Sequence, residues 1–225
     1  MTVWTLHLLN ARKRLFPVMD RVRATARDAV ARSADHIALP SFDLIVRAGD
    51  GAVSNGGIVA RTPGPGVIEV TLAPGRMDPA VLLRLLVRQM AHLVRRDGPG
   101  RDRSLGEALA GEGLAGHFVL DVLGGQPDAL DAVRPSPGVM RQAMHEWARR
   151  DHDPGRWFDG TGDLRRGTGT GLGHRIVAEH LARNPDDRAS RLLAAPAEPF
   201  RQSLRRLAAE TQGEGRDADR AASDG

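Results

Sequence analysis

The apolar pattern of the chain changes at Asp78-Pro79, and this change constrains the fold more than any other feature of the sequence. Before it, short apolar or alternating segments are typical of strands. They predict four strands and one helix, at Val3–Leu9, 11–36, 42–48, 57–61 and 66–72. After it, apolar residues recur at helical spacing. Strands followed by helices predict an α+β fold with a small N-terminal sheet and a mostly helical second half.

The helical half is divided by capping residues and loops. Asp78 followed by Pro79 is a typical helix start, and Ser104 is a good cap for the next helix. The predicted helices are 79–96, 104–123, 137–150, 172–183 and 187–210, the last with a break near Pro196. Residues 212–225 carry no apolar side chain larger than alanine. We therefore expect a single domain over 1–211 and a disordered tail over 212–225.

Two absences limit the chemistry of the chain. It contains no cysteine, which excludes disulfides, thiolate-bound zinc, iron–sulfur clusters and a thiol nucleophile. It also contains no tyrosine, so no phenol is available as an acid or oxyanion donor.

The charge of the chain does not favour a nucleic-acid-binding protein. The net charge is +4 over 225 residues, and the arginines are interspersed with acidic residues instead of forming a stripe. Nucleic acid is therefore an unlikely partner, although an Arg-rich nucleic-acid-binding domain is kept as a further alternative. No apolar run approaches the length of a membrane span, and the N-terminus does not resemble a signal peptide. We expect a cytoplasmic protein without a membrane partner.

The run Gly167 to Gly173, GTGTGLG, invites comparison with a phosphate-binding loop. It fits neither the dinucleotide-binding nor the Walker pattern, and no predicted strand precedes it. We interpret these glycines as the opening of a helix.

Two consecutive predicted helices carry the residues with the most chemical content. In the first, Arg88 and His92 are one turn apart and share a face. In the second, Glu112 lies in a surround of small and apolar residues, where a carboxylate needs a partner. Glycines at 111, 113 and 116 in the same helix allow another helix to approach closely.

At these residues the chain resembles the predicted Zn-dependent proteases grouped as domain of unknown function 2268. The resemblance extends over most of residues 1–200. It includes, in order, VWTLHLLNA, TPGPG before VIEVTL, SLGEALAGEGLAGHF, WFDGTGDL and GLGHRIV. It implies a zincin-like (gluzincin-like) metallopeptidase fold.

The family motif is H-E-x-x-H on a helix, followed about twenty residues later by a Glu within E-G-L-A. By resemblance, His92 is the second histidine and Glu112 the third zinc ligand. The sequence departs from the motif at the first histidine, which is Arg88, and at the general base, which is Gln89. The resemblance also places Thr170 near the position of a family tyrosine that steadies the oxyanion.

These departures predict a catalytically impaired pseudo-peptidase. A guanidinium stays protonated and repels a cation, and an amide cannot take a proton from water. We expect no bound cofactor, with Arg88 replacing the metal and pairing with Glu112. A metallopeptidase with a rearranged zinc site that uses His92 and Glu112 is the alternative.

The resemblance also implies where a partner would bind. In zincin-like proteins an extended peptide adds to the edge strand beside the site. The candidate edge strand is 66–72, with Val67, Ile68, Glu69 and Val70 as peptide-binding residues. The expected partner is therefore a peptide or protein segment.

Overall fold

A computed structural model describes residues 2–49, 55–97 and 104–209. It divides into two compact units, each described by itself below. Unit 1 is Met1–Arg101 with Phe118–Gly125, and unit 2 is Asp102–His117 with Gln126–Gly225. A small N-terminal sheet precedes a mostly helical remainder, so the α+β prediction is confirmed. One domain over 1–211 stays a prediction, and the expected tail at 212–225 lies outside the described residues.

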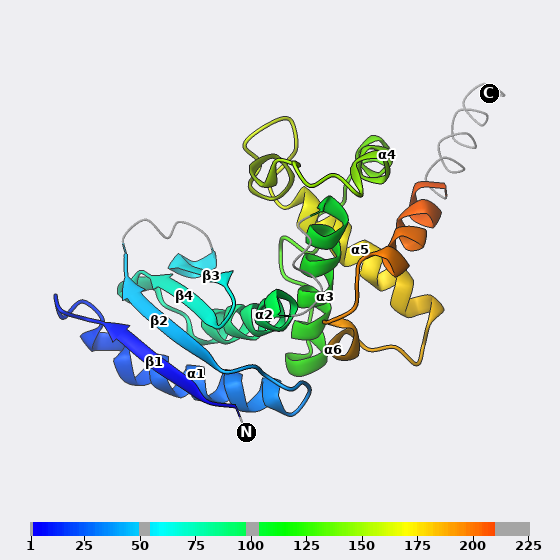
Figure 1. Cartoon of the computed structure of the whole chain (residues 1–225). Coiled ribbons are helices and arrows are strands. Elements are labelled where there is room, and N and C mark those ends of the chain that lie inside the picture. Colours follow the sequence, from blue (N-terminus) through cyan, green and yellow to red (C-terminus); the bar gives the residue numbers. More distant parts are fainter. Residues whose placement is uncertain (1, 50–54, 98–103, 210–225) are drawn as a thin grey trace. The chain divides into compact units, whose positions relative to one another are not determined.

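Unit 1 contains the four predicted strands in one sheet (Figure 1). The strands are β1 (Trp4–Leu9), β2 (Phe42–Ala48), β3 (Ile58–Gly64) and β4 (Val67–Leu72), in the spatial order β1-β2-β4-β3. β1, β2 and β4 are parallel, whereas β3 and β4 form the predicted antiparallel hairpin. Gly66 in the hairpin turn has φ +68°, which is the left-handed region that favours glycine.

The sheet has one apolar face, and its other face is mixed, with exposed Val3, Leu9 and Val59 beside polar residues. On β2 and β4, alternate side chains from Phe42 to Val46 and from Ile68 to Leu72 are buried. Two helices, α1 (Met19–Ala34) and α2 (Pro79–Asp97), pack against each other and supply the apolar layer of unit 1. The opposite face carries polar pairs such as Arg61–Glu69. Unit 1 is therefore a two-layer α/β sandwich. Its core lies between alternate side chains of the strands and the apolar side chains that recur every three or four residues on the helices.

The helix starts follow the predicted caps. The backbone N–H of Ala80 donates to the Asp78 carboxylate (2.8 Å), and the N–H of Glu107 donates to the Ser104 hydroxyl (3.2 Å). α1 begins at Met19, after a turn of 3₁₀ helix at Phe16–Val18, because Pro17 lacks an N–H and fits only near a helix start. Further 3₁₀ turns lie at Asn55–Gly57 and Pro74–Arg76.

Unit 2 is helical throughout its described elements. α3 (Leu105–Leu123) contributes its first part to unit 2 and its residues from Phe118 onward to unit 1. The other helices are α4 (Pro137–Glu146), a π-helical turn (Gly155–Asp159), α5 (Thr168–Arg183), α6 (Ala189–Leu192) and the helical residues 198–209. The predicted helix 137–150 was four residues too long, and 172–183 begins four residues earlier. The break expected near Pro196 is confirmed.

None of the described helices combines the length and the apolar composition that crossing a membrane requires.

Candidate functional site

One face of α2 in unit 1 carries three basic side chains. Arg88, His92 and Arg95 follow each other at spacings of four and three residues, so they lie on the same side of the helix. Arg88 and Arg95 are buried, at 8% and 5% exposure, and His92 is half-buried. Arg95 had not been singled out from the sequence. Two permanently charged guanidinium groups therefore lie one turn before and one turn after the candidate ligand His92.

Gln89, which was predicted to occupy the position of a general base, has a structural partner. The hydroxyl of Thr62 on β3 lies 3.1 Å from the Gln89 side-chain oxygen and 3.3 Å from the Gln89 backbone oxygen. Both residues are buried, with 6% exposure each. The Gln89 amide therefore anchors α2 to β3. No local sequence pattern identifies Thr62, because only pairing of the hairpin brings it next to α2.

Strand β4 is not at the edge of the sheet, so the expectation for 66–72 was wrong. β4 pairs with β2 on one side and with β3 on the other. Val67, Ile68, Glu69 and Val70 therefore have neighbouring strands on both sides. In the described part of the chain, β3 is the edge strand at this end of the sheet. The prediction was made by resemblance and failed because β4 is the strand of the hairpin that pairs with β2, which leaves β3 outside it.

Glu112 and Thr170 belong to unit 2. Glu112 is half-buried on α3, and Thr170 is buried on α5. These two helices meet at Gly113 and Gly173: a Cβ on Gly113 would lie 2.1 Å from the Gly173 backbone oxygen. The close helix approach that the glycines of α3 predicted is confirmed at this position. Arg88 and Glu112 lie in different units, so their pairing stays a prediction.

The glycines of GTGTGLG serve packing. Gly167 precedes α5 with φ +80°, and a Cβ on Gly171 would lie 2.0 Å from the Val133 backbone oxygen. A Cβ on Gly169 would overlap the Phe158 ring at 2.5 Å. The interpretation of this run as a helix opening is confirmed, since α5 begins at Thr168 within it.

The segment WFDGTGDL is closed by an ion pair. The Arg156 guanidinium donates to both carboxylate oxygens of Asp163, at 2.5 and 2.9 Å, and also to the Gln142 side-chain oxygen at 3.0 Å. The hydrogen bond from Arg156 lowers the pKa of the exposed Asp163 carboxyl. Trp157 in the same segment is fully buried. This family-like segment thus has a structural explanation within unit 2.

Glu107 and His117, five residues before and after Glu112 on α3, make structural contacts of their own. The Glu107 carboxylate accepts the backbone N–H of Ala197 (2.6 Å), just before helical residues 198–209. His117 stacks on His174 with ring centroids 4.0 Å apart, and its Nε2 lies 3.1 Å from the His174 backbone oxygen. Across the described ranges, no group of three or more His, Asp or Glu side chains is placed to hold a metal ion.

Comparison with known protein families assigns the chain to one family. The sequence pattern of a family described as predicted Zn-dependent protease (DUF2268) matches residues 22–202. The chain belongs to this family. No curated protein and no solved structure gives a significant match.

The family's name implies a zinc ion, and the donor set of this chain does not fit one. A catalytic zinc takes three protein ligands with lone pairs. The ligand positions predicted in α2 provide His92 alone, because Arg88 has no lone pair to donate and is a fixed positive charge. Arg95 adds a second cation to the same face, and Gln89 bonds to Thr62. We therefore assign no step to a metal.

Proposed function

We propose that this protein is a pseudo-peptidase: a zincin-like member of the DUF2268 family that binds extended peptide segments without cleaving them. The proposal rests on the family membership and on the residues that occupy its catalytic positions. The fold class of the protein supports the proposal, since a small sheet precedes the helices that carry those positions.

The observation that carries the proposal is the bond between Thr62 and Gln89. A general base must reach the attacking water and accept its proton. The Gln89 side-chain oxygen instead accepts a hydrogen bond from Thr62 in a buried setting (3.1 Å), and an amide has no basicity near neutral pH. The side chain at this position therefore joins a helix to a strand, and because it is an amide it cannot take a proton from water.

Arg88 supplies the second argument. Its guanidinium is buried and remains charged, so it requires an anionic or carbonyl partner. The family places a glutamate, here Glu112, as a ligand of the same zinc ion. We propose that the Arg88 guanidinium takes the place of the metal and pairs with the Glu112 carboxylate.

Peptide binding is proposed at β3, which replaces β4 as the candidate edge. Val59 on β3 is 42% exposed and Pro63 is exposed, whereas Ile58 and Thr62 face the helices. A peptide strand added to the regular part of β3, Ile58–Arg61, would extend the sheet through main-chain hydrogen bonds. The register shift after Arg61 and the missing N–H of Pro63 limit the pairing to this part. Its side chains would alternate between the two faces of the sheet.

The first test is metal content, measured by mass spectrometry on untagged protein after zinc addition and dialysis. The proposal expects a negligible zinc content for the natural chain. The double variant Arg88→His with Gln89→Glu restores the motif and is expected to hold about one zinc per chain. The matched control adds His92→Ala to this double variant and is expected to lose the zinc again.

Two results would contradict the proposal. Tightly held zinc in the natural chain, with peptide cleavage that a chelator abolishes, would establish the rearranged site with His92 and Glu112 as first ligands. Zinc-free protein whose repaired variant also holds none would show that the motif has been aligned to the wrong turn of α2.

A further inference from the structure

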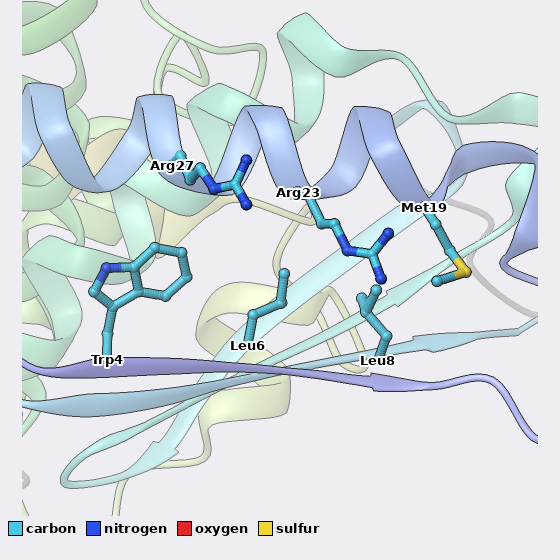
Figure 2. Close-up of a pocket in the computed structure, with 6 residues that line it drawn as sticks. All are labelled: Trp4, Leu6, Leu8, Met19, Arg23 and Arg27. Atoms are coloured by element: carbon cyan, nitrogen blue, oxygen red, sulfur yellow. The ribbon is translucent and has the colours of Figure 1, made fainter.

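The other edge of the sheet carries an open groove between β1 and α1 (Figure 2). Its volume is about 440 Å³. Six side chains line it, from β1 and α1 respectively: Trp4, Leu6, Leu8, Met19, Arg23 and Arg27. In Figure 2 the side chains of the strand and those of the helix point toward each other across the groove. The groove lies within unit 1 and does not depend on the function proposed above.

The apolar face of the sheet extends beyond the part that the helices bury. Leu6 pairs with Leu44 in register, so both side chains lie on the same face. Leu44 has no exposure, whereas Leu6 is half-buried, as are Trp4 and Leu8. β1 therefore presents three large apolar side chains that are incompletely covered, at the rim of an otherwise sealed layer.

The backbone of the same three residues faces outward. Phe42 N–H donates to the Val3 carbonyl (3.1 Å), so the backbone groups of Val3 point toward β2. Because the direction alternates along a strand, the N–H and C=O groups of Trp4, Leu6 and Leu8 point to the opposite side. In the described part of the chain β1 has β2 as its single neighbour. These outward groups form a template for another strand.

This edge lacks the usual protection against strand pairing. Natural edge strands are often interrupted by Lys, Pro or inward-pointing charges. The segment Val3–Leu9, VWTLHLL, contains none of these and no bulge interrupts its pairing with β2. An unprotected apolar edge of this kind is suited to receive a strand.

The charge beside the edge specifies what kind of strand fits. Seven basic and two acidic residues lie between 10 and 34, a larger surplus than the +4 of the whole chain. Arg23 is paired with Asp20, which is 98% exposed, and no ion pair of Arg27 is found among the described residues. Both guanidinium groups extend from α1 over the apolar side chains (Figure 2).

The spacing of the two arginines matches an extended chain. Arg23 and Arg27 are four residues apart on a helix, which is about 6 Å along its axis. Alternate side chains of a strand repeat about every 6.6 Å on one face. Glutamates at alternate positions of an added strand would lay their aliphatic stems beside the apolar side chains of β1. Their carboxylates would then reach the two guanidinium groups.

We infer that β1 accepts an extended acidic segment of a partner protein, which pairs with the outward backbone of Trp4, Leu6 and Leu8 and binds Arg23 and Arg27 through alternate carboxylates. A second copy of this chain is a poorer occupant. Two-fold pairing of β1 with β1 would place the arginines of both copies on the same face of the joined sheet, where they repel.

The chain contains its own reporter for this binding. Trp147 and Trp157 are 3% and 0% exposed, whereas Trp4 is half-buried in the groove. A strand covering β1 removes water from Trp4, so it shifts the tryptophan emission to shorter wavelength. The probe is a short end-blocked peptide in which glutamate alternates with valine and threonine. Its controls are the same peptide with glutamine for glutamate, and an isomer with all the glutamates consecutive.

The expected result is a saturable emission shift with the alternating glutamate peptide, and much weaker binding of both control peptides. The double variant Arg23→Gln with Arg27→Gln is expected to weaken binding at least about fivefold, and added salt to weaken it further. Arg21→Gln changes an exposed arginine of the same helix outside the groove, so it is expected to bind like the natural chain.

A second variant tests the backbone part of the inference. Leu6→Pro removes an outward N–H and leaves the backbone groups of Thr5 and His7, which face β2, in place. It is expected to abolish the emission shift while circular dichroism remains that of the natural chain. The arginine variants keep the inference testable if this variant does not fold.

Three results would overturn the inference. The first is the absence of a saturable shift with the alternating peptide. The second is equal binding by the natural chain and by the Arg23→Gln, Arg27→Gln variant. The third is a concentration-dependent dimer in sedimentation that Leu6→Pro abolishes, which would make a second copy the occupant of β1.

Discussion

The Thr62 hydroxyl lies 3.1 Å from the side-chain oxygen of Gln89, and this bond links the edge strand β3 to the helix that carries the family motif. Both side chains are buried. The same hydroxyl would also satisfy a carboxylate oxygen, which has the same acceptor geometry. The local fold can therefore hold either the glutamate of the motif or the glutamine of this chain without moving the strand.

Removing this hydroxyl is expected to destabilise the protein. Thr62→Val keeps the shape of the side chain but leaves the buried Gln89 oxygen without this donor, which costs about 1–3 kcal/mol in free energy of unfolding. Urea unfolding measures the change. Thr5→Val, at an exposed position of β1, is the matched control and should shift the free energy by less than about 0.5 kcal/mol. Equal effects of the two variants would contradict the role of the Thr62 bond.

The contact between α3 and α5 should tolerate no side chain at Gly113. A Cβ there would lie 2.1 Å from the Gly173 oxygen, and this atom belongs to a helix backbone that cannot move aside alone. Gly113→Ala is expected to cost about 1–3 kcal/mol or more, because overpacking forces backbone shifts. The control is Gly138→Ala in α4, where a Cβ meets nothing closer than 3.8 Å. There the change should be neutral or slightly stabilising, and thermal unfolding distinguishes the two.

The Arg156–Asp163 pair gives a pH-dependent contribution to stability. The pKa of Asp163 is lowered by its hydrogen bond to Arg156, below an ordinary value of 3.8. A lowered folded-state pKa means that the contribution is complete above the unfolded-state pKa and is lost as the pH falls through the folded-state pKa. Asp163→Asn should therefore lower the melting temperature at neutral pH, and the difference should shrink in strong acid. A difference that stays constant with pH would contradict the ion pair as its source.

The fold was predictable where local sequence signals agree with the tertiary structure. Phe42 to Ala48 alternates except at Ile45, and β2 has those bounds. Pro17, Asp78 and Ser104 mark the helix starts because a cap is a property of a few adjacent residues. The strand order was not predictable in the same way. Whether β3 or β4 lies outside depends on which strand pairs with β2, and neither strand is charged or polar enough to indicate it.

The sequence was enough to select the residues of the candidate site, but not to say which side chains they contact. Arg88, Gln89, His92 and Glu112 were found through the family motif. Thr62 and Arg95 were missed, because their importance follows from the packing of β3 on α2 and from burial of one helix face. The Gly113 contact was predictable only in part, since a glycine in a helix indicates a close approach but does not identify the partner.

The pairing of Arg88 with Glu112 can be decided by a double-mutant cycle. If the two side chains are partners, Arg88→Met leaves the half-buried Glu112 carboxylate uncompensated, Glu112→Gln leaves the buried Arg88 guanidinium uncompensated, and the double variant removes both charges. The coupling free energy from urea unfolding is then expected to reach about 0.5–3 kcal/mol, whereas distant sites add within about 0.3–0.5 kcal/mol. Arg84→Met combined with Glu112→Gln is the control cycle, because Arg84 lies on α2 four residues before Arg88 and outside the motif. Coupling no larger for Arg88 than for Arg84 would rule out the exchange of metal for guanidinium.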